Sequence, residues 1–119
     1  MNAVNTYKEH AVTTQTRGRL IVLLYDGAIK FLRLALRELD AGHQAEKGLY
    51  IGKAQAVLVE LNTSLNMAAG GEIANNLRNL YNFMDRHLSE ANLHRDGEKI
   101  RQVLACLEDL NESWKAISA

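Results

Sequence analysis

The amino-acid sequence predicts an all-α protein, an antiparallel four-helix bundle with a short mobile N-terminal segment. Three observations lead to this prediction. The chain contains no proline, so no residue in it forces a helix to end. Apolar residues recur every three or four positions in four segments, which is the spacing of an amphipathic helix. Glycines separate these segments, and a length of 119 residues with 47% hydrophobic and 24% charged residues fits one globular domain.

The bundle domain is assigned to residues 14–119, and residues 1–13 are expected to stand apart from it. This N-terminal segment is mostly polar, and a chain terminus is mobile unless it docks. The first helix is predicted over about 16–41, after a threonine N-cap. Gly42 follows the last apolar position and is expected to cap the C-terminal end of this helix.

Three further helices are predicted after this break, over about 44–66, 72–93 and 97–117. The pair Gly70–Gly71 is expected to form the turn before the third helix, and Asp96 is expected to cap the N-terminus of the fourth. Because the connections are short, sequential helices are expected to pack as antiparallel neighbours.

Composition excludes several classes of partner. Lys plus Arg and Asp plus Glu each number 14, so the net charge is zero, and no basic run offers a surface for nucleic acid or an anionic membrane. The longest apolar run, residues 20–25, is much shorter than the roughly 20 residues that a membrane span needs. The first ten residues contain no apolar signal core, so we expect a cytoplasmic protein.

Cys106 is the single cysteine, and we expect a buried thiol instead of a disulfide.

The segment LIVLLYDGAIKFL at residues 20–32 is too apolar for an ordinary bundle helix. At about 100° per residue it carries two apolar sides, and its polar residues share one narrow strip. One side includes Ile21, Tyr25 and Ala28, and the second includes Leu20 and Leu23. Part of this helix is therefore either surrounded by its own protein or exposed for a partner.

Two residues within this segment leave two interpretations open. Gly27 interrupts the middle of the helix at a cost of roughly 1 kcal/mol relative to alanine. Such a glycine indicates close packing against another part of the chain or against a partner. Tyr25 belongs either to the core or to a groove. Tyr81 and Trp114 fall on apolar stripes of later helices, and we expect core positions with polar tips that reach solvent.

No arrangement of titratable residues indicates catalysis. Glu90 and His94 have the i, i+4 spacing that could hold a metal. Di-iron bundles, however, use Glu-x-x-His pairs on two helices, and this chain contains no Glu-x-x-His. We therefore expect these two side chains to be solvated, and the sequence indicates no metal and no cofactor. Phosphate-binding glycine motifs and nucleophile elbows are also absent from the sequence.

Two classes of function remain. The first is a helix-binding module that accepts amphipathic segments of a partner on its excess apolar surface. The second is a self-associating structural bundle, in which the second apolar side of the first helix is a homodimer interface. A groove-binding protein could use an apolar terminal arm as a temporary cover, and Tyr7 and Val12 would make such a cover.

The sequence resembles a known family, the flagellar secretion chaperone FliS, over nearly its whole length. LIVLLYDGAIKFL at 20–32 resembles the LYDGAI-type signature of the family's first helix, and KAQAVLVELNTSLN at 53–66 is similar to its second helix. The third helix adds the run LYNFM at 80–84, and Trp114 matches a tryptophan near the end of the family's chains. These four matches occur in the family's order.

The resemblance implies a bacterial cytosolic bundle without catalysis or cofactor. Its client would be the C-terminal region of flagellin, which is disordered before assembly and folds as helical segments along the chaperone's apolar grooves. Binding would prevent premature polymerisation and keep flagellin competent for the flagellar type III export apparatus. In the family the N-terminal segment covers part of the groove, and Tyr7 occupies the position of a family tyrosine there.

The chain departs from the family pattern at the start of the first helix. The family often has a proline in a TASPEKL-like stretch, whereas this chain has the residues TRGRL at 16–20. His10 lies near the place of a second N-terminal aromatic. The candidate partner-binding residues are the apolar positions of the first helix and the N-terminal tyrosine: Tyr7, Leu20, Leu23, Leu24, Tyr25, Gly27 and Phe31.

Overall fold

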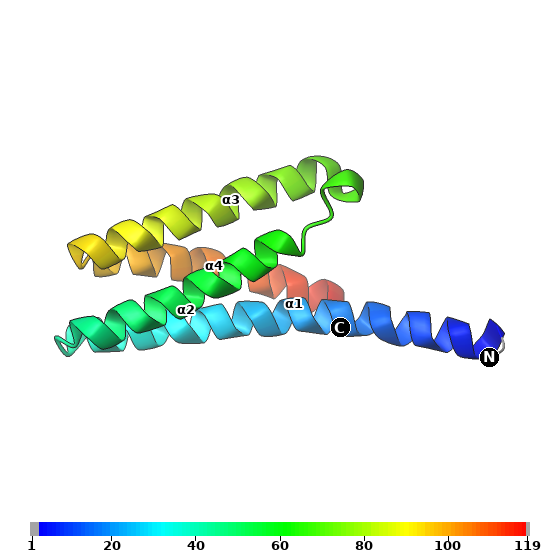
Figure 1. The fold of residues 1–119 in the computed structure, drawn as a ribbon, viewed down its shortest axis with the longest axis horizontal. Helices are drawn as coiled ribbons and strands as arrows, with labels where there is room; N and C mark the ends of the chain where they lie inside the picture. The colour runs from blue at the N-terminus through cyan, green and yellow to red at the C-terminus, as the bar shows by residue number, and fades with distance from the viewer. Residues whose placement is uncertain (1–2, 119) are drawn as a thin grey trace.

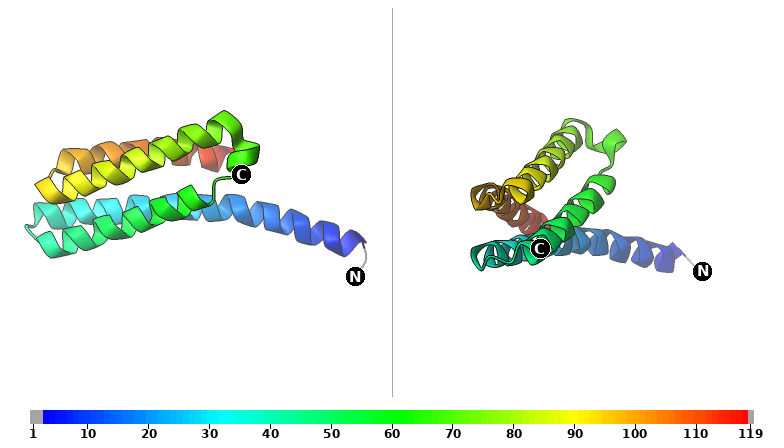
Figure 2. Two further views of the ribbon diagram at one scale, coloured as in Figure 1. Left: turned by 45° about the horizontal axis from the view of Figure 1, so that its top comes forward. Right: turned by 60° about the vertical axis from the view of Figure 1, so that its left-hand side comes forward.

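The computed structural model describes residues 3–118, and the side chains of residues 17–118. Over this range the chain forms four helices: α1 (Ala3–Asp40), α2 (Gln44–Thr63), α3 (Met67–His94) and α4 (Gly97–Ser118). They run alternately up and down, so that α1 pairs with α2 and α3 pairs with α4 (Figures 1 and 2). Helix α1 also packs on α4, and α2 on α3, which closes the bundle. The prediction of an all-α antiparallel four-helix bundle is confirmed.

Helix α1 begins earlier than its sequence indicated. It was predicted to begin near residue 16, but its backbone is helical from Ala3 and has no break between residues 13 and 14. The reason is that residues 3–17 contain neither proline nor glycine, so nothing in this stretch stops a helix once it has formed. The N-terminal part of α1 extends well beyond the ends of the other helices (Figure 1).

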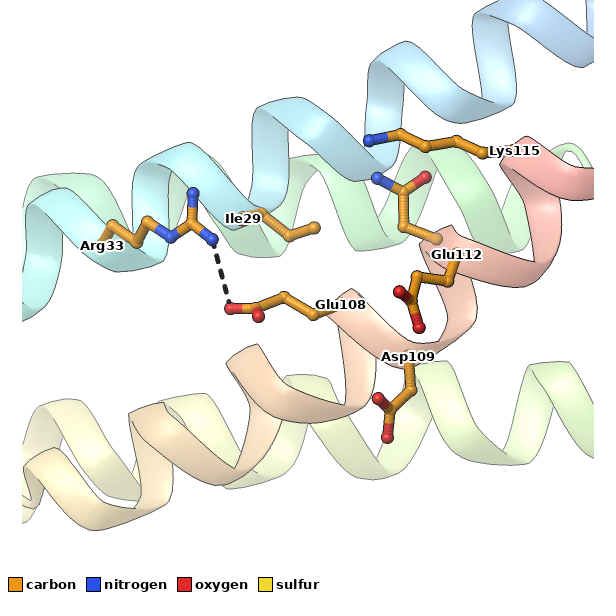
Figure 3. Close-up of a pocket in the computed structure, with 7 residues that line it drawn as sticks. Ile29, Arg33, Glu108, Asp109, Glu112 and Lys115 are labelled. Carbon is orange, nitrogen blue, oxygen red and sulfur yellow. Dashed lines mark hydrogen bonds and ion pairs between the residues drawn. The ribbon is translucent and has the colours of Figure 1, made fainter.

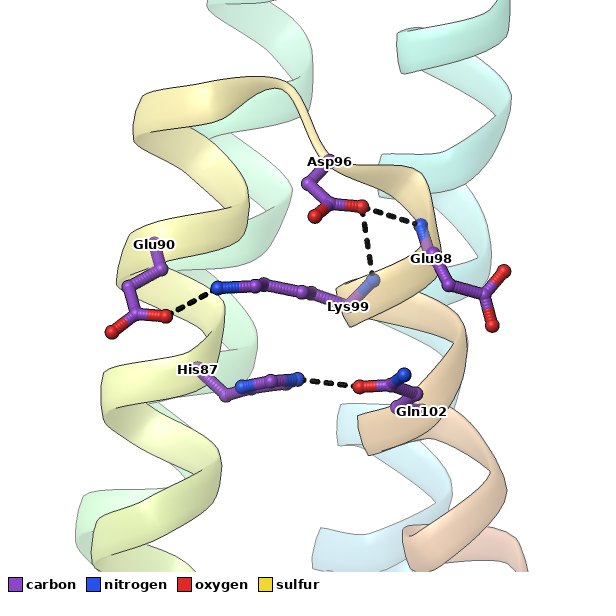
Figure 4. Close-up of polar contacts among 6 residues, drawn as sticks. All are labelled: His87, Glu90, Asp96, Glu98, Lys99 and Gln102. Atoms are coloured by element: carbon purple, nitrogen blue, oxygen red, sulfur yellow. Dashed lines mark hydrogen bonds and ion pairs between the residues drawn. The ribbon is translucent and has the colours of Figure 1, made fainter.

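The C-terminal end of α1 and the start of α4 confirm the predicted caps. Gly42 has a φ of +81°, and the His43 N–H donates to the Glu38 carbonyl at 2.9 Å, as in a glycine-terminated helix. At the start of α4, Asp96 Oδ1 accepts hydrogen bonds from the backbone N–H groups of Glu98 (3.1 Å) and Lys99 (3.4 Å) (Figure 4).

The connection between α2 and α3 differs from the prediction. Helix α2 ends at Thr63, and helical geometry resumes at Met67, before the predicted start at residue 72. The physical reason is a cap that the sequence analysis missed, because Asn66 Oδ1 accepts a hydrogen bond from the Ala69 N–H at 3.1 Å. Gly71 then takes non-helical angles (φ 53°, ψ −129°) and redirects the chain into the long part of α3.

The core is aliphatic except at one aromatic layer, where side chains from three helices meet. Tyr25 of α1 is fully buried, and its hydroxyl lies 2.6 Å from the hydroxyl of Tyr81 on α3. The ring of Trp114 on α4 lies 6.3 Å from that of Tyr25. Burial raises the pKa of both tyrosines because the phenolate would lose its hydration. This layer connects α1 directly to α3 across the bundle.

Polar side chains bridge α3 to its two neighbours. Between α3 and α4, the His87 ring forms a 2.7 Å hydrogen bond with the Gln102 side chain, and Lys99 forms an ion pair with Glu90 (Figure 4). On the α2 side, the buried Lys47 ammonium donates to a backbone carbonyl in the last turn of α3 at 3.0 Å. A cation at a helix C-terminus also interacts favourably with the negative end of the helix dipole.

Candidate partner-binding groove

The second apolar side of α1 is exposed to solvent in the folded chain. Leu20 is 52% exposed and Leu23 is 61% exposed, whereas the core side of the same helix is buried. Leu24 is partly buried and joins this side to the core. Ile73 and Leu93 of α3 are more exposed still, but it is neighbouring apolar side chains on one face, such as Leu20 and Leu23, that are typical of a surface that binds a partner. The exposure of Leu20 and Leu23 agrees with a second apolar side of α1, and the contact of Leu20, Leu23 and Leu24 with a partner stays a prediction.

A groove runs between this side of α1 and the C-terminal end of α2. Its volume is about 640 Å³, and its lining combines leucines and a methionine with one residue of each charge at the rim: Arg17, Leu20, Ile21, Leu24, Glu60, Ser64, Leu65, Asn66 and Met67. The sequence analysis missed the residues that α2 and the connection after it contribute. No local signal could have found them, because they become lining residues only when α2 packs beside α1.

An aromatic pair continues the apolar side of α1 towards the other end of α2. Phe31 of α1 stacks on Tyr50 of α2, with ring centroids 6.5 Å apart and planes 22° apart. The Lys53 ammonium lies 5.7 Å from the Phe31 centroid and 5.8 Å from that of Tyr50, within the range of a cation–π contact. Phe31 is therefore partly covered by α2 but remains at the surface.

Gly27 lies between these two parts of the surface, and the place where its side chain would be is open among the described residues. A Cβ built at this position meets no heavy atom within 4 Å. The sequence left two interpretations open for Gly27. The first, close packing within the chain, is not found among the described residues. The other interpretation, contact with a partner, stays a prediction.

Two candidates need correction or lie outside the described region. The structure places Tyr25 in the core and not in a groove, because its hydroxyl finds a partner in Tyr81 on the opposite helix. Tyr81 was expected to present its polar tip to solvent, but that tip is used in the same buried contact. The side chain of Tyr7 lies outside the described side chains.

A second cleft, of about 380 Å³, lies between α1 and α4 and has a different chemistry (Figure 3). Arg33 of α1 reaches Glu108 of α4 at 3.4 Å. Asp26 accepts a hydrogen bond from the buried Asn111 amide at 2.7 Å and lies 3.4 Å from the Lys115 ammonium. Arg33 and Lys115 each pair with a carboxylate across the two helices, so this cleft contributes to fixing α1 against α4.

Chemistry at single residues is limited in the described part of the chain. Among the described residues, no cluster of three or more His, Cys, Asp or Glu side chains could hold a metal. Glu90, one of the two residues considered for a metal, pairs with Lys99, and this hydrogen bond lowers the pKa of its carboxyl. Cys106 is partly buried instead of fully buried, and burial raises the pKa of its thiol.

None of the described helices is long and apolar enough to cross a membrane.

A helical bundle with one helix apolar on a second, exposed side is the arrangement expected of a helix-binding module or of a self-associating bundle. Comparison with known proteins identifies the family to which this bundle belongs. The family model for flagellar protein FliS matches residues 1–119. The chain therefore belongs to the FliS family.

Curated relatives support this assignment. The chain is 39% identical to the flagellar secretion chaperone FliS of Salmonella typhimurium over 111 residues, which covers 92% of this chain and 82% of the relative. It is 32% identical to FliS of Bacillus subtilis over 114 residues, covering 96% and 84% of the two chains. It is 34% identical to the flagellar secretion chaperone FliSB of Pseudomonas aeruginosa over 122 residues, covering 99% and 97%.

Proposed function

We propose that this protein is a flagellar secretion chaperone that binds the disordered C-terminal region of flagellin in apolar grooves. Binding prevents premature polymerisation of flagellin and keeps it competent for flagellar type III secretion. The protein acts in the cytosol by binding alone, without catalysis or a cofactor, and it also contacts the export apparatus. Neither nucleic acid nor insertion into a membrane is part of this function.

The observation that carries the proposal is the exposed apolar side of α1 and the groove beside it. A disordered client loses conformational entropy when it binds, so it needs a large apolar surface in compensation. The surface between Leu20 and Phe31, together with the groove lined by the end of α2, offers such a surface. The contacting residues we propose are those of the second side of α1: Leu20, Leu23, Leu24, Gly27 and Phe31.

The experiment tests this side of α1 by introducing a charge. Leu23→Asp and Phe31→Asp are each compared with the wild type for folding by circular dichroism and for binding to flagellin by calorimetry. Leu93→Asp is the matched control, because Leu93 is 77% exposed but lies on α3. We expect all three variants to fold and only the two α1 variants to lose affinity. If both α1 variants fold and bind normally, this side of α1 is not the client groove.

We propose that the N-terminal residues 1–13 fold back to cover the groove until the client arrives, although residues 3–13 here begin α1 and extend beyond the other helices. Tyr7 would supply an aromatic side chain for this cover. Because cover and client compete for one surface, deletion of residues 1–13 should leave the bundle folded and raise the affinity for flagellin. An unchanged affinity, measured by calorimetry on the folded deletion variant, would remove the cover from the mechanism.

Self-association is the alternative function for the same surface. A second copy could cover the apolar side of α1, which gives a homodimer of the protein in the absence of client. Light scattering distinguishes the two functions. A chaperone forms a 1:1 complex with its client, whereas a structural bundle stays a stable dimer and has no affinity for flagellin.

A further inference from the structure

Gly27 is less favourable in a helix than alanine, and nothing in the described part of the chain requires a glycine there. It lies thirteen residues before the end of α1, inside a continuous helix, where glycine is less favourable than alanine. Among the described residues, no heavy atom outside its own stretch of helix lies within 4 Å of the place where its Cβ would be. Its φ is not among the positive values found in this chain, so the backbone does not need glycine either. We therefore look for the reason for glycine at position 27 in a contact with another molecule.

Gly27 and its apolar neighbours on α1 surround a hole on the helix surface. Leu20, Leu23, Leu24 and Gly27 stand at the spacing i, i+3, i+4 and i+7. In knobs-into-holes packing, four residues at this spacing surround the hole that receives one side chain of a facing helix. Two of them, Leu20 and Leu23, are more than half exposed. Glycine at the fourth position makes this hole deeper and brings its floor to the helix backbone.

We propose that Gly27 is the point of closest approach for a helical segment of the client, which inserts one bulky apolar side chain against the backbone of α1. This inference deepens the proposed function and rests on it. The occupant is a helix with a leucine-sized or aromatic side chain at its centre. A smaller side chain would leave the hole partly empty, and an empty hole forfeits contacts with the atoms that line it.

Length and charge describe the rest of the occupant. The apolar side of α1 from Leu20 to Phe31 spans roughly 17 Å at 1.5 Å per residue, so a helix of about 12 residues covers it. The exposed Lys30 follows Gly27 by three positions on α1, and Lys53 of α2 lies over the aromatic pair. A client helix with acidic residues beside its apolar stripe would complement these two ammonium groups.

The test separates helix propensity from close approach. Gly27→Ala is compared with Gly52→Ala, a matched control in the middle of α2 that also has no heavy atom within 4 Å of its Cβ position. Gly52 is exposed, does not line the groove, and lies about 200° around α2 from Tyr50, so it faces away from the Phe31–Tyr50 pair. Each substitution should raise the Tm of the client-free protein by about 4 °C, because alanine favours the helix.

Calorimetry with the C-terminal segment of the cognate flagellin then gives the decisive comparison. Gly27→Ala should weaken binding by about tenfold, because a methyl group inserted into a packed contact forces the two helices apart. Gly52→Ala should bind like the wild type. Gly27→Leu should weaken binding further, and circular dichroism establishes that this variant folds. A more stable variant with weaker binding is thus the expected signature of Gly27 alone.

Three results would overturn the inference. If Gly27→Ala gains stability and binds like the wild type, the client does not approach the α1 backbone there, although the proposed function stands. If Gly27→Ala loses stability, the glycine serves the fold itself. If the wild-type chain has no affinity for the flagellin segment, the proposed function fails and the inference fails with it.

Discussion

The hydroxyl pair of Tyr25 and Tyr81 is predicted to be the strongest single polar link across the bundle. The two oxygens lie 2.6 Å apart, and the side chains are 0% and 2% exposed, so neither hydroxyl can turn to water. In Tyr25→Phe the Tyr81 hydroxyl would stay buried without this partner. Leaving a buried polar group unsatisfied costs about 1–3 kcal/mol of the free energy of unfolding.

The two single variants are not expected to be equal. The Trp114 indole, whose ring centroid lies 6.3 Å from that of Tyr25, leaves the Tyr25 hydroxyl a polar neighbour in Tyr81→Phe. We therefore expect Tyr81→Phe to cost about 1 kcal/mol, less than Tyr25→Phe. The double variant Tyr25→Phe/Tyr81→Phe removes both hydroxyls and should be close to the wild type, because paired apolar replacements are nearly neutral.

Urea unfolding followed by circular dichroism measures these free energies, and the double-mutant cycle gives the coupling between the two residues. The expected Tm loss is about 4 °C for each kcal/mol in a chain of this size. Two results would refute the reasoning. Either Tyr25→Phe is as stable as the wild type, or the double variant loses as much stability as the two single variants together.

Three further predictions concern a cap, the pH and the thiol. Asp96→Ala should lower the free energy of unfolding by about 1 kcal/mol in urea titrations, because it removes the side-chain acceptor for two N–H groups at the start of α4. Stability should fall as the pH rises above about 10, the ordinary tyrosine pKa, because the folded state keeps phenol protons that the unfolded chain releases. The double variant Tyr25→Phe/Tyr81→Phe should lack this fall in a pH series of urea titrations. A thiol reagent at pH 8 should label Cys106 at least about tenfold more slowly in the folded protein than in urea, since burial raises the pKa of the thiol.

Helix ends with a local chemical cause could be predicted from the sequence. Gly42 and Asp96 act through their own backbone or side chain within three residues, so a single sequence suffices to recognise them. The start of α1 has no such cause. A threonine cap at 14 or 16 was expected as the boundary, but a low helix propensity does not stop a helix that contains no proline.

The candidate site could be predicted only where it depends on α1 alone. The exposed side with Leu20 and Leu23 follows from the spacing of apolar residues within one helix. The burial of Tyr25 depends on a hydroxyl 56 residues away in the sequence, and the groove depends on Leu65 and Met67 beyond the end of α2. These are consequences of packing between helices, which the period of one helix does not contain.

The buried Asn111 had a signal that the sequence analysis did not use. It follows Leu107 by four residues and precedes Trp114 by three, so it occupies a core position of α4. A polar residue at such a position indicates a specific partner, and the structure supplies Asp26 of α1.

Calorimetric titration of the full chain with the C-terminal segment of its cognate flagellin, with light scattering on the client-free protein, tests the role of the exposed side of α1 most directly. We predict a monomer that binds the segment in a 1:1 complex, with the negative heat-capacity change that accompanies burial of apolar surface. A stable dimer without affinity for the segment would contradict this role and would assign the exposed side of α1 to self-association.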